Sequence, residues 1–128
     1  MITQITVRWG DMDAYQHVNN AVYLSWLETA RIEFAQAHLP SAITFIVAHI
    51  SIDYSKPVFY PDTVICESHI EKIGRTSLHM TTSIHSKKQN IQVAQGRTVI
   101  VNFNYASNQT LPWDEKTRKI LMRFTQTQ

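Results

Sequence analysis

The chain has 128 residues, of which 44% are hydrophobic and 17% charged, and this composition indicates one globular domain over residues 1–128 rather than a disordered chain. The formal net charge of +2 is too small to indicate a nucleic-acid partner, and we expect none. One cysteine, Cys66, excludes an intramolecular disulfide and a four-cysteine zinc site, and this usage is typical of a cytoplasmic protein.

The first predicted element is a strand over residues 2–9. Ile5, Val7 and Trp9 alternate with polar residues, which places these three side chains on one face of the strand. Gly10 ends the strand. Neither this segment nor a later one has the pattern of a secretory signal or the roughly 20 apolar residues that cross a bilayer, so we expect no membrane association.

The second predicted element is a helix from Asn20 to His38, which is long for so small a domain. Asn19 or Asn20 is a suitable N-cap, and Pro40 biases Leu39 away from helical angles, so the helix is expected to end there. Apolar residues recur at spacings of three and four and form one buried stripe. The stripe consists of Tyr23, Trp26, Leu27, Ala30 and Phe34.

Alternation of apolar and polar residues returns after Pro40 and predicts four more strands. The first two of these are separated at Pro57 and Pro61, because proline removes a donor from the ladder of hydrogen bonds. The predicted strands cover residues 46–55, 63–73, 75–85 and 91–105.

The tail, residues 112–124, is predicted to be a short helix that docks through Trp113, Ile120 and Phe124. One helix before four consecutive strands does not fit a doubly wound parallel sheet. We therefore predict the α+β class, with one antiparallel five-stranded sheet wrapped around a long central helix and a short C-terminal helix. The exposed edges of such a sheet favour pairing with a second copy, so we expect a homodimer or homotetramer.

A polar loop, residues 11–19, leads directly into the N-terminus of the predicted helix. The first N–H groups of a helix lack intrahelical partners, and with the macrodipole they favour an anion or a developing oxyanion. A carboxylate beside such donors supplies the other part that acyl transfer needs, because it activates water or attacks a carbonyl directly. The loop is therefore a candidate active site.

Other interpretations of this loop remain open at this point. Aspartate, asparagine and histidine before a helix commonly serve only as caps and turn formers. Asp11 and Asp13 begin like a calcium loop, but Gln16 replaces the turn glycine and Val22 the bidentate acid. A metal held by Asp11, Asp13 and His17 is a weaker alternative, and we expect no metal and no cofactor.

The segment WGDMDAYQHVNNAVYLSWLETAR, residues 9–31, resembles the opening of hot-dog-fold acyl-CoA thioesterases of the 4-hydroxybenzoyl-CoA thioesterase type. It is most similar to the long-chain bacterial acyl-CoA thioesterases that carry D-x-Y-Q-H-V-N-N, and acyl-ACP thioesterases of plants share H-V-N-N-x-x-Y. Tyr54, Pro57 and Asp62 match the Y-x-x-P-x-x-x-x-D junction of the family. The resemblance covers nearly the whole chain and implies a hot-dog fold that hydrolyses a fatty or aromatic acyl-CoA.

The resemblance also implies roles for individual residues. Asp13 matches the catalytic carboxylate, which acts as nucleophile or general base, and the backbone oxyanion donor falls near Asn20. One branch of the family has a histidine at the position of Asn20, whereas in this chain the histidine comes earlier, at His17. An acid/base role therefore does not transfer from that branch, and His17 is either an active participant, an organiser of the loop, or a bystander. Asn19 either orients water or caps the helix, and Tyr23 is a candidate wall of the acyl pocket.

The expected partner is an acyl-CoA, with acyl-ACP as a second possibility. Two rival functions belong to other classes: a non-catalytic acyl-CoA-binding module, and a hot-dog hydratase or dehydratase with an acid/base pair at the acyl α and β carbons. Asp11 is expected to serve the structure of the loop. Candidate cations for the CoA phosphates are Lys56, Arg75, Lys87, Lys88 and Arg97.

Overall fold

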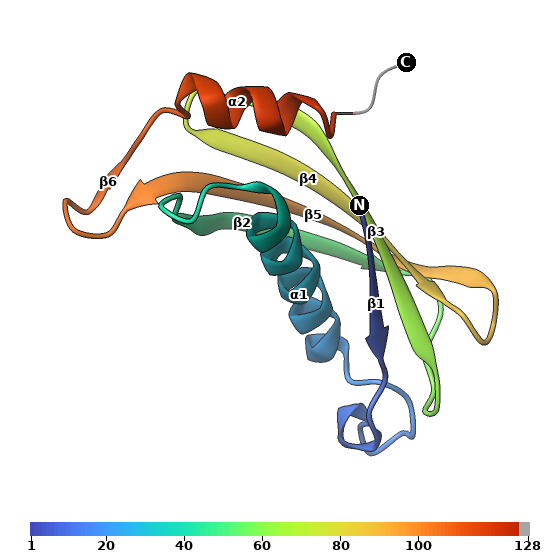
Figure 1. The fold of residues 1–128 in the computed structure, drawn as a ribbon. Coiled ribbons are helices and arrows are strands. Elements are labelled where there is room, and N and C mark those ends of the chain that lie inside the picture. The colour runs from blue at the N-terminus through green and yellow to red at the C-terminus, as the bar shows by residue number, and fades with distance from the viewer. Residues whose placement is uncertain (126–128) are drawn as a thin grey trace.

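A curved antiparallel sheet wraps around the long helix α1 in the computed structural model, which describes residues 1–125 (Figure 1). The strands run in the order β1-β3-β4-β5-β2, and β6 pairs with β5 outside this path. The α+β class and the wrapped antiparallel sheet are as predicted, and the two-residue β6 adds a short strand that was not predicted. The strands are β1 (Ile2–Thr6), β2 (Phe45–Tyr54), β3 (Thr63–Ile73), β4 (Ser77–Ser86), β5 (Ile91–Asn104) and β6 (Gln109–Thr110).

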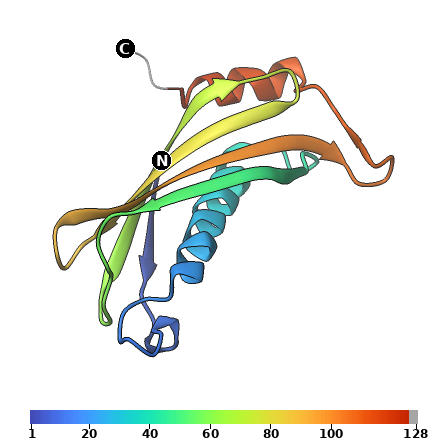
Figure 2. The same cartoon turned by 180° about the vertical axis from the view of Figure 1, so that it is seen from behind.

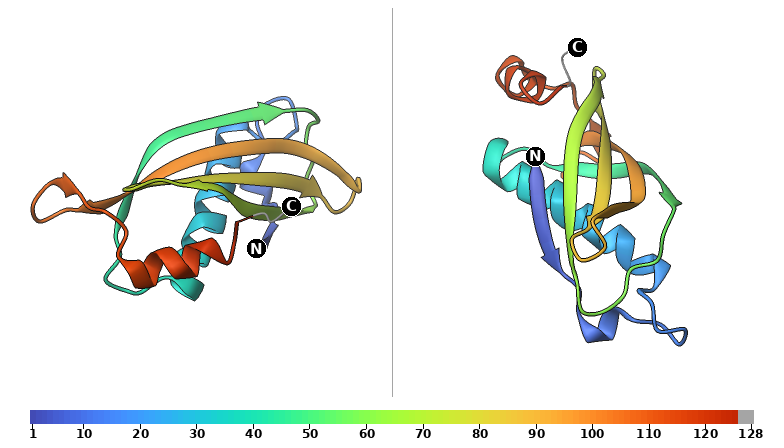
Figure 3. Two further views of the ribbon diagram at one scale, coloured as in Figure 1. Left: turned by 90° about the horizontal axis from the view of Figure 1, so that it is seen from above. Right: turned by 90° about the vertical axis from the view of Figure 1, so that its right-hand side faces the viewer.

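Helix α1 (Asn20–His38) begins and ends where the sequence predicted. The side chain of Asn19 caps it by accepting the N–H of Ala21 at 3.0 Å. At the other end, Leu39 is extended, as expected for a residue before Pro40. Figures 1 and 2 show α1 crossing one face of the sheet, and Figure 3 shows the sheet curving around it.

The buried face of α1 contains all five residues of the predicted stripe. Leu27 packs directly on the backbone of β5 at Gly96, where an added Cβ would lie 2.6 Å from the Cδ1 atom of Leu27. Arg31, which is not part of the predicted stripe, is also buried, with 7% of its surface exposed. The helix therefore buries one charged side chain that its apolar periodicity did not indicate.

The first strand is shorter than predicted. β1 ends at Thr6, and Trp9–Asp11 form a short 3-10 helix instead of continuing the strand. The carboxylate of Asp11 accepts the backbone N–H of Arg8 at 2.8 Å and turns the chain there. Trp9 was predicted to share a strand face with Ile5 and Val7, and this was wrong: it lies outside the strand, and 77% of its surface is exposed.

The C-terminal helix α2 (Glu115–Met122) occupies the middle of the predicted segment 112–124. Trp113 docks as expected, but the buried residues of the helix are Thr117 and Leu121, whereas Ile120 stays partly exposed. α2 lies at the end of the sheet opposite to the loop before α1 (Figure 1). Within residues 1–125, no helix is long and apolar enough to cross a membrane.

Candidate active site

The loop before α1 folds back on itself between Met12 and Val18, which form an antiparallel bridge. Inside this bridge the N–H of Asp13 donates to the carbonyl of His17 at 2.8 Å, and the N–H of Gln16 donates to the carbonyl of Asp13 at 3.1 Å. Gln16 takes a positive φ of 66°, which closes the turn. These backbone bonds bring the side chains of Asp13 and His17 to the same side of the loop.

Asp13 and His17 form a pair, with 3.4 Å between the Oδ2 atom of Asp13 and the Nδ1 atom of His17. The other carboxylate oxygen, Oδ1, accepts the N–H of Tyr15 at 2.8 Å. The Nδ1 atom of His17 also lies 3.3 Å from the carbonyl oxygen of Val18. Because a carbonyl oxygen can only accept, Nδ1 of the neutral ring donates to Val18, and Nε2 is left as the acceptor.

The N-terminus of α1 lines a small cavity of about 240 Å³ together with His17. Within residues 1–125, the backbone N–H of Asn20 has no hydrogen-bond partner, while its carbonyl accepts the Tyr54 hydroxyl at 2.9 Å. The side chain of Asn19 is engaged as the helix cap. A free backbone donor therefore lies at the start of α1, on the wall of a cavity that His17 shares.

Tyr23 forms a second wall of the same cavity and is 2% exposed. Its ring packs edge-on against Tyr54, with 4.9 Å between the ring centres. Burial raises the pKa of the Tyr23 phenol, so the side chain stays neutral. This wall is aromatic and uncharged.

A larger cavity of about 640 Å³ opens on the other side of Asp13. Three aromatic side chains line it with Asp13, and each is 45% exposed or more: Trp9, Phe59 and Tyr60. Sequence reasoning missed all three. It placed Trp9 inside a strand, and it treated the segment with Phe59 and Tyr60 only as a break between strands. The sequence feature that could have indicated this cavity is the pair of adjacent aromatic residues, Phe59 and Tyr60, in a loop.

Asp11 serves the loop itself, as expected. It is 2% exposed, and its carboxylate is held by the guanidinium of Arg8, with 2.8 Å between Nη2 and Oδ1. The Asp11 carboxylate raises the pKa of Arg8. In the part of the chain that the structure describes, no group of three histidine, cysteine or acidic side chains is arranged to hold a metal ion.

Comparison with known proteins gives consistent matches along nearly the whole chain. Residues 7–121 match the family model of the thioesterase-like superfamily. The chain is 30% identical over 130 residues to the long-chain acyl-CoA thioesterase FadM of Escherichia coli, covering 94% of this chain and 96% of that protein.

Two solved structures have the same fold. A predicted thioesterase from Bacillus stearothermophilus superposes with a TM-score of 0.90 at 28% identity, covering 99% of this chain and 97% of the other. A thioesterase from Thermus thermophilus, complexed with coenzyme A and zinc, superposes with a TM-score of 0.85 at 31% identity, covering 94% and 95% of the two chains.

Proposed function

The chain belongs to the thioesterase-like superfamily, and from this premise we propose that it hydrolyses a fatty or aromatic acyl-CoA to a free acid and CoA. Membership of this family agrees with the thioesterase class and the hot-dog fold that the sequence predicted. The similarity to FadM supports acyl-CoA as the substrate. The observation that carries the proposal is the carboxylate of Asp13, paired with His17 beside the N-terminus of a buried helix.

Asp13 is the proposed catalytic carboxylate. As a general base it takes a proton from water while the water oxygen attacks the thioester carbonyl. As a nucleophile it attacks the carbonyl itself, and water then hydrolyses the resulting anhydride. In both routes the C–S bond breaks and a thiolate leaves, which needs little protonation because thiols ionise near pH 8.5.

The proposed oxyanion donor is the free backbone N–H of Asn20. It lies at the positive end of α1, and a helix of 19 residues presents its first N–H groups toward developing negative charge. Asn19 keeps the helix start in place through its cap, and the Tyr54 hydroxyl holds the carbonyl of Asn20. Tyr23 is the proposed wall for the acyl group.

His17 is proposed to position Asp13. The Nδ1 atom of His17 lies 3.4 Å from Oδ2, and the N–H of Tyr15 donates to Oδ1 at 2.8 Å, so both carboxylate oxygens lie against groups of the loop and retain lone pairs for water or substrate. This arrangement restrains the rotation of the carboxylate without neutralising it.

Thiol release from short, long and aromatic acyl-CoAs tests the proposal, with wild type compared with Asp13→Asn. If Asp13 is a general base, the substitution lowers kcat by about 10²-fold to 10⁴-fold. An unimpaired Asp13→Asn enzyme would contradict the assignment of Asp13. If wild type bound acyl-CoA without releasing thiol, the non-catalytic binding module would replace the proposal, and an altered acyl chain without thiol release would indicate a hydratase.

The edge strand β2 supports the proposal of a homodimer. Within residues 1–125, β2 pairs only with β5, which leaves the other edge of a ten-residue strand open. A symmetric pairing of two copies along β2 would extend the sheet across both. Size-exclusion chromatography with light scattering tests this: wild type should elute at twice the monomer mass or a multiple, and a monomer at micromolar concentration would contradict it.

A further inference from the structure

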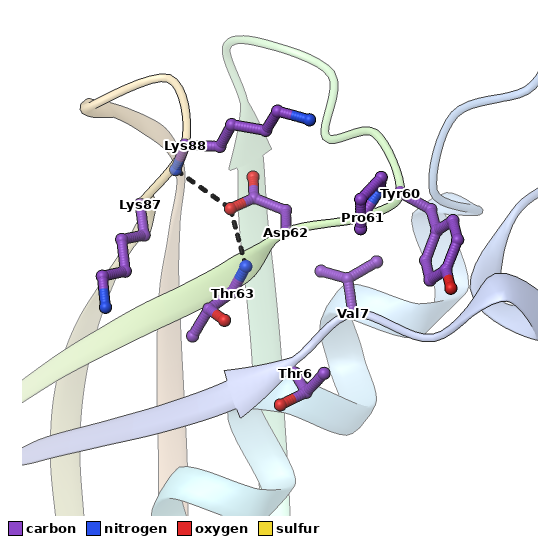
Figure 4. Close-up of a pocket in the computed structure, with 8 residues that line it drawn as sticks. All are labelled: Thr6, Val7, Tyr60, Pro61, Asp62, Thr63, Lys87 and Lys88. Atoms are coloured by element: carbon purple, nitrogen blue, oxygen red, sulfur yellow. Dashed lines mark hydrogen bonds between the residues drawn. The ribbon is translucent and has the colours of Figure 1, made fainter.

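We propose that a second cavity, between residues 60–63 and the β4–β5 hairpin, binds the phosphate groups of the CoA nucleotide; this inference rests on the proposed function. The cavity has a volume of about 520 Å³. Its lining includes Tyr60, Pro61 and Asp62 on one side and the lysines Lys87 and Lys88 of the hairpin on the other (Figure 4).

The hairpin that carries the two lysines is fixed to the rest of the sheet. The N–H of Lys87 donates to the carbonyl of Thr63 at 2.9 Å, and the N–H of Lys88 donates to the Asp62 carboxylate at 3.0 Å. Asn90 closes the turn with a positive φ of 55°. The lysine backbones are therefore held in place, and only their side chains must be ordered by a ligand.

The Asp62 carboxylate also lines this cavity, but it forms no ion pair with the lysine side chains within residues 1–125. Its Oδ1 atom accepts the N–H groups of Thr63, at 2.6 Å, and of Lys88, and its Oδ2 atom accepts the hydroxyl of Ser86. Neither Lys87 nor Lys88 forms an ion pair within residues 1–125. Both ammonium groups are therefore available to an anion.

The two lysine side chains diverge from the hairpin near Asp62, and Tyr60 lies across the cavity from Lys87 (Figure 4). CoA carries a 3′-phosphate and a diphosphate on either side of one ribose, so two separated ammonium groups suit it better than one. Lysine is a common phosphate ligand, and an exposed aromatic ring offers a face for a purine. The Tyr60 side chain is 45% exposed.

The cavity also lies on the same end of the molecule as Asp13. Tyr60 lines both this cavity and the larger cavity that contains Asp13. Another pair of lysines that could bind phosphate, Lys116 and Lys119, is on α2, at the opposite end of the sheet (Figure 1). β3 spans that distance with 11 residues, which corresponds to roughly 35 Å. Arg8, near Asp13 in sequence, is already engaged by Asp11.

The test compares wild type with the double variant Lys87→Ala/Lys88→Ala and with a control, Lys116→Ala/Lys119→Ala, which changes the net charge by the same amount. Each protein receives one acyl group on CoA, on dephospho-CoA and on pantetheine. We expect the Lys87/Lys88 variant to raise KM for the acyl-CoA about tenfold with kcat unchanged. The difference from wild type should shrink with dephospho-CoA and disappear with pantetheine, which has no nucleotide.

Three outcomes would overturn the inference. These are an unchanged KM in the Lys87/Lys88 variant, a larger rise in the control variant, and an equal loss on pantetheine thioesters. Direct titration of CoA into each protein separates this inference from the proposed function. If wild type released no thiol, and only the Lys87/Lys88 variant bound CoA more weakly, the proposed hydrolysis would be contradicted and the proposed phosphate site would be supported.

Discussion

The Nδ1 atom of His17 lies 3.4 Å from the Oδ2 atom of Asp13 and 3.3 Å from the carbonyl oxygen of Val18. Since a carbonyl oxygen can only accept, Nδ1 of the neutral ring donates to Val18 and faces the Asp13 carboxylate. On this ground we propose that His17 positions Asp13, because proton transfer to or from substrate would use Nε2.

Replacement of His17 tests that distinction. Asparagine keeps a donor near the position of Nδ1 but has nothing at Nε2, so His17→Asn should retain most of the wild-type kcat. His17→Ala removes the donor and should lower kcat about tenfold or more. The measurement is kcat as a function of pH with an acyl-CoA. Equal loss in both variants, with disappearance of a limb of the pH profile, would indicate that His17 transfers a proton.

Gly96 is predicted to be intolerant of a side chain. An added Cβ would lie 2.6 Å and 2.8 Å from the two Cδ atoms of Leu27, so either the Leu27 side chain must repack or α1 and β5 must shift. We expect Gly96→Ala to lower the free energy of unfolding by about 1–3 kcal/mol, as other overpacked cores do. Gly10→Ala is the matched control, since nothing lies within 4 Å of its added Cβ. Urea denaturation of both variants checks this prediction. Equal free energies of unfolding would show that the Leu27 side chain repacks around the added methyl group without cost.

Arg31 is predicted to be replaceable without loss of stability. Its Nη1 atom is buried without a hydrogen-bond partner within residues 1–125, and its Nη2 atom lies 3.8 Å from Glu28, which is 63% exposed. Burial lowers the pKa of Arg31, so the charged form is disfavoured where it lies. Arg31→Met should leave the free energy of unfolding unchanged or raise it by up to about 1 kcal/mol.

Glu28→Gln serves as the control for Arg31, because it removes the weak ion pair and leaves the guanidinium buried. It should change the free energy of unfolding by less than about 0.5 kcal/mol. A loss above roughly 2 kcal/mol in Arg31→Met, in the same denaturation experiment, would show that Arg31 has a partner that stabilises it.

Cys66 is predicted to be unreactive in the folded protein. It is fully buried on β3, and burial, with a smaller effect of Glu33, raises the pKa of its thiol to about 12. The folded state therefore keeps the proton, whereas the unfolded thiol ionises near pH 8.5. The contribution of Cys66 to stability is present below about pH 8.5 and declines as the pH rises toward 12.

Labelling with a thiol-reactive chromophore at pH 8 measures this directly. Native protein should react only on the timescale of unfolding, and protein in denaturant should react at once. Cys66→Ser gives the background rate. Rapid labelling of the native protein would show that the thiol is reachable from solvent.

Local patterns in the sequence determined the helix and the loop that precedes it. Asn19 and Pro40 mark the ends of α1, because capping and the restriction before proline act on neighbouring residues. The spacing of apolar residues predicted the buried stripe, since periodicity reports which face of an element is covered. The motif around Asp13 and His17 is also local, and the loop that pairs them closes within a few residues.

Only the tertiary structure decided what surrounds that loop. Phe59 and Tyr60 reach the cavity of Asp13 because the connection between β2 and β3 passes beside it. Lys87 and Tyr60 line one cavity because β3 and β4 pair in the register that places Ser86 opposite Val64. Trp9 lies outside the strand and is exposed because the chain turns at the Asp11 carboxylate, which overrode the alternation that had placed it on one strand face with Ile5 and Val7. Contacts between distant segments depend on how strands pair and curve, and no periodicity within one segment contains that information.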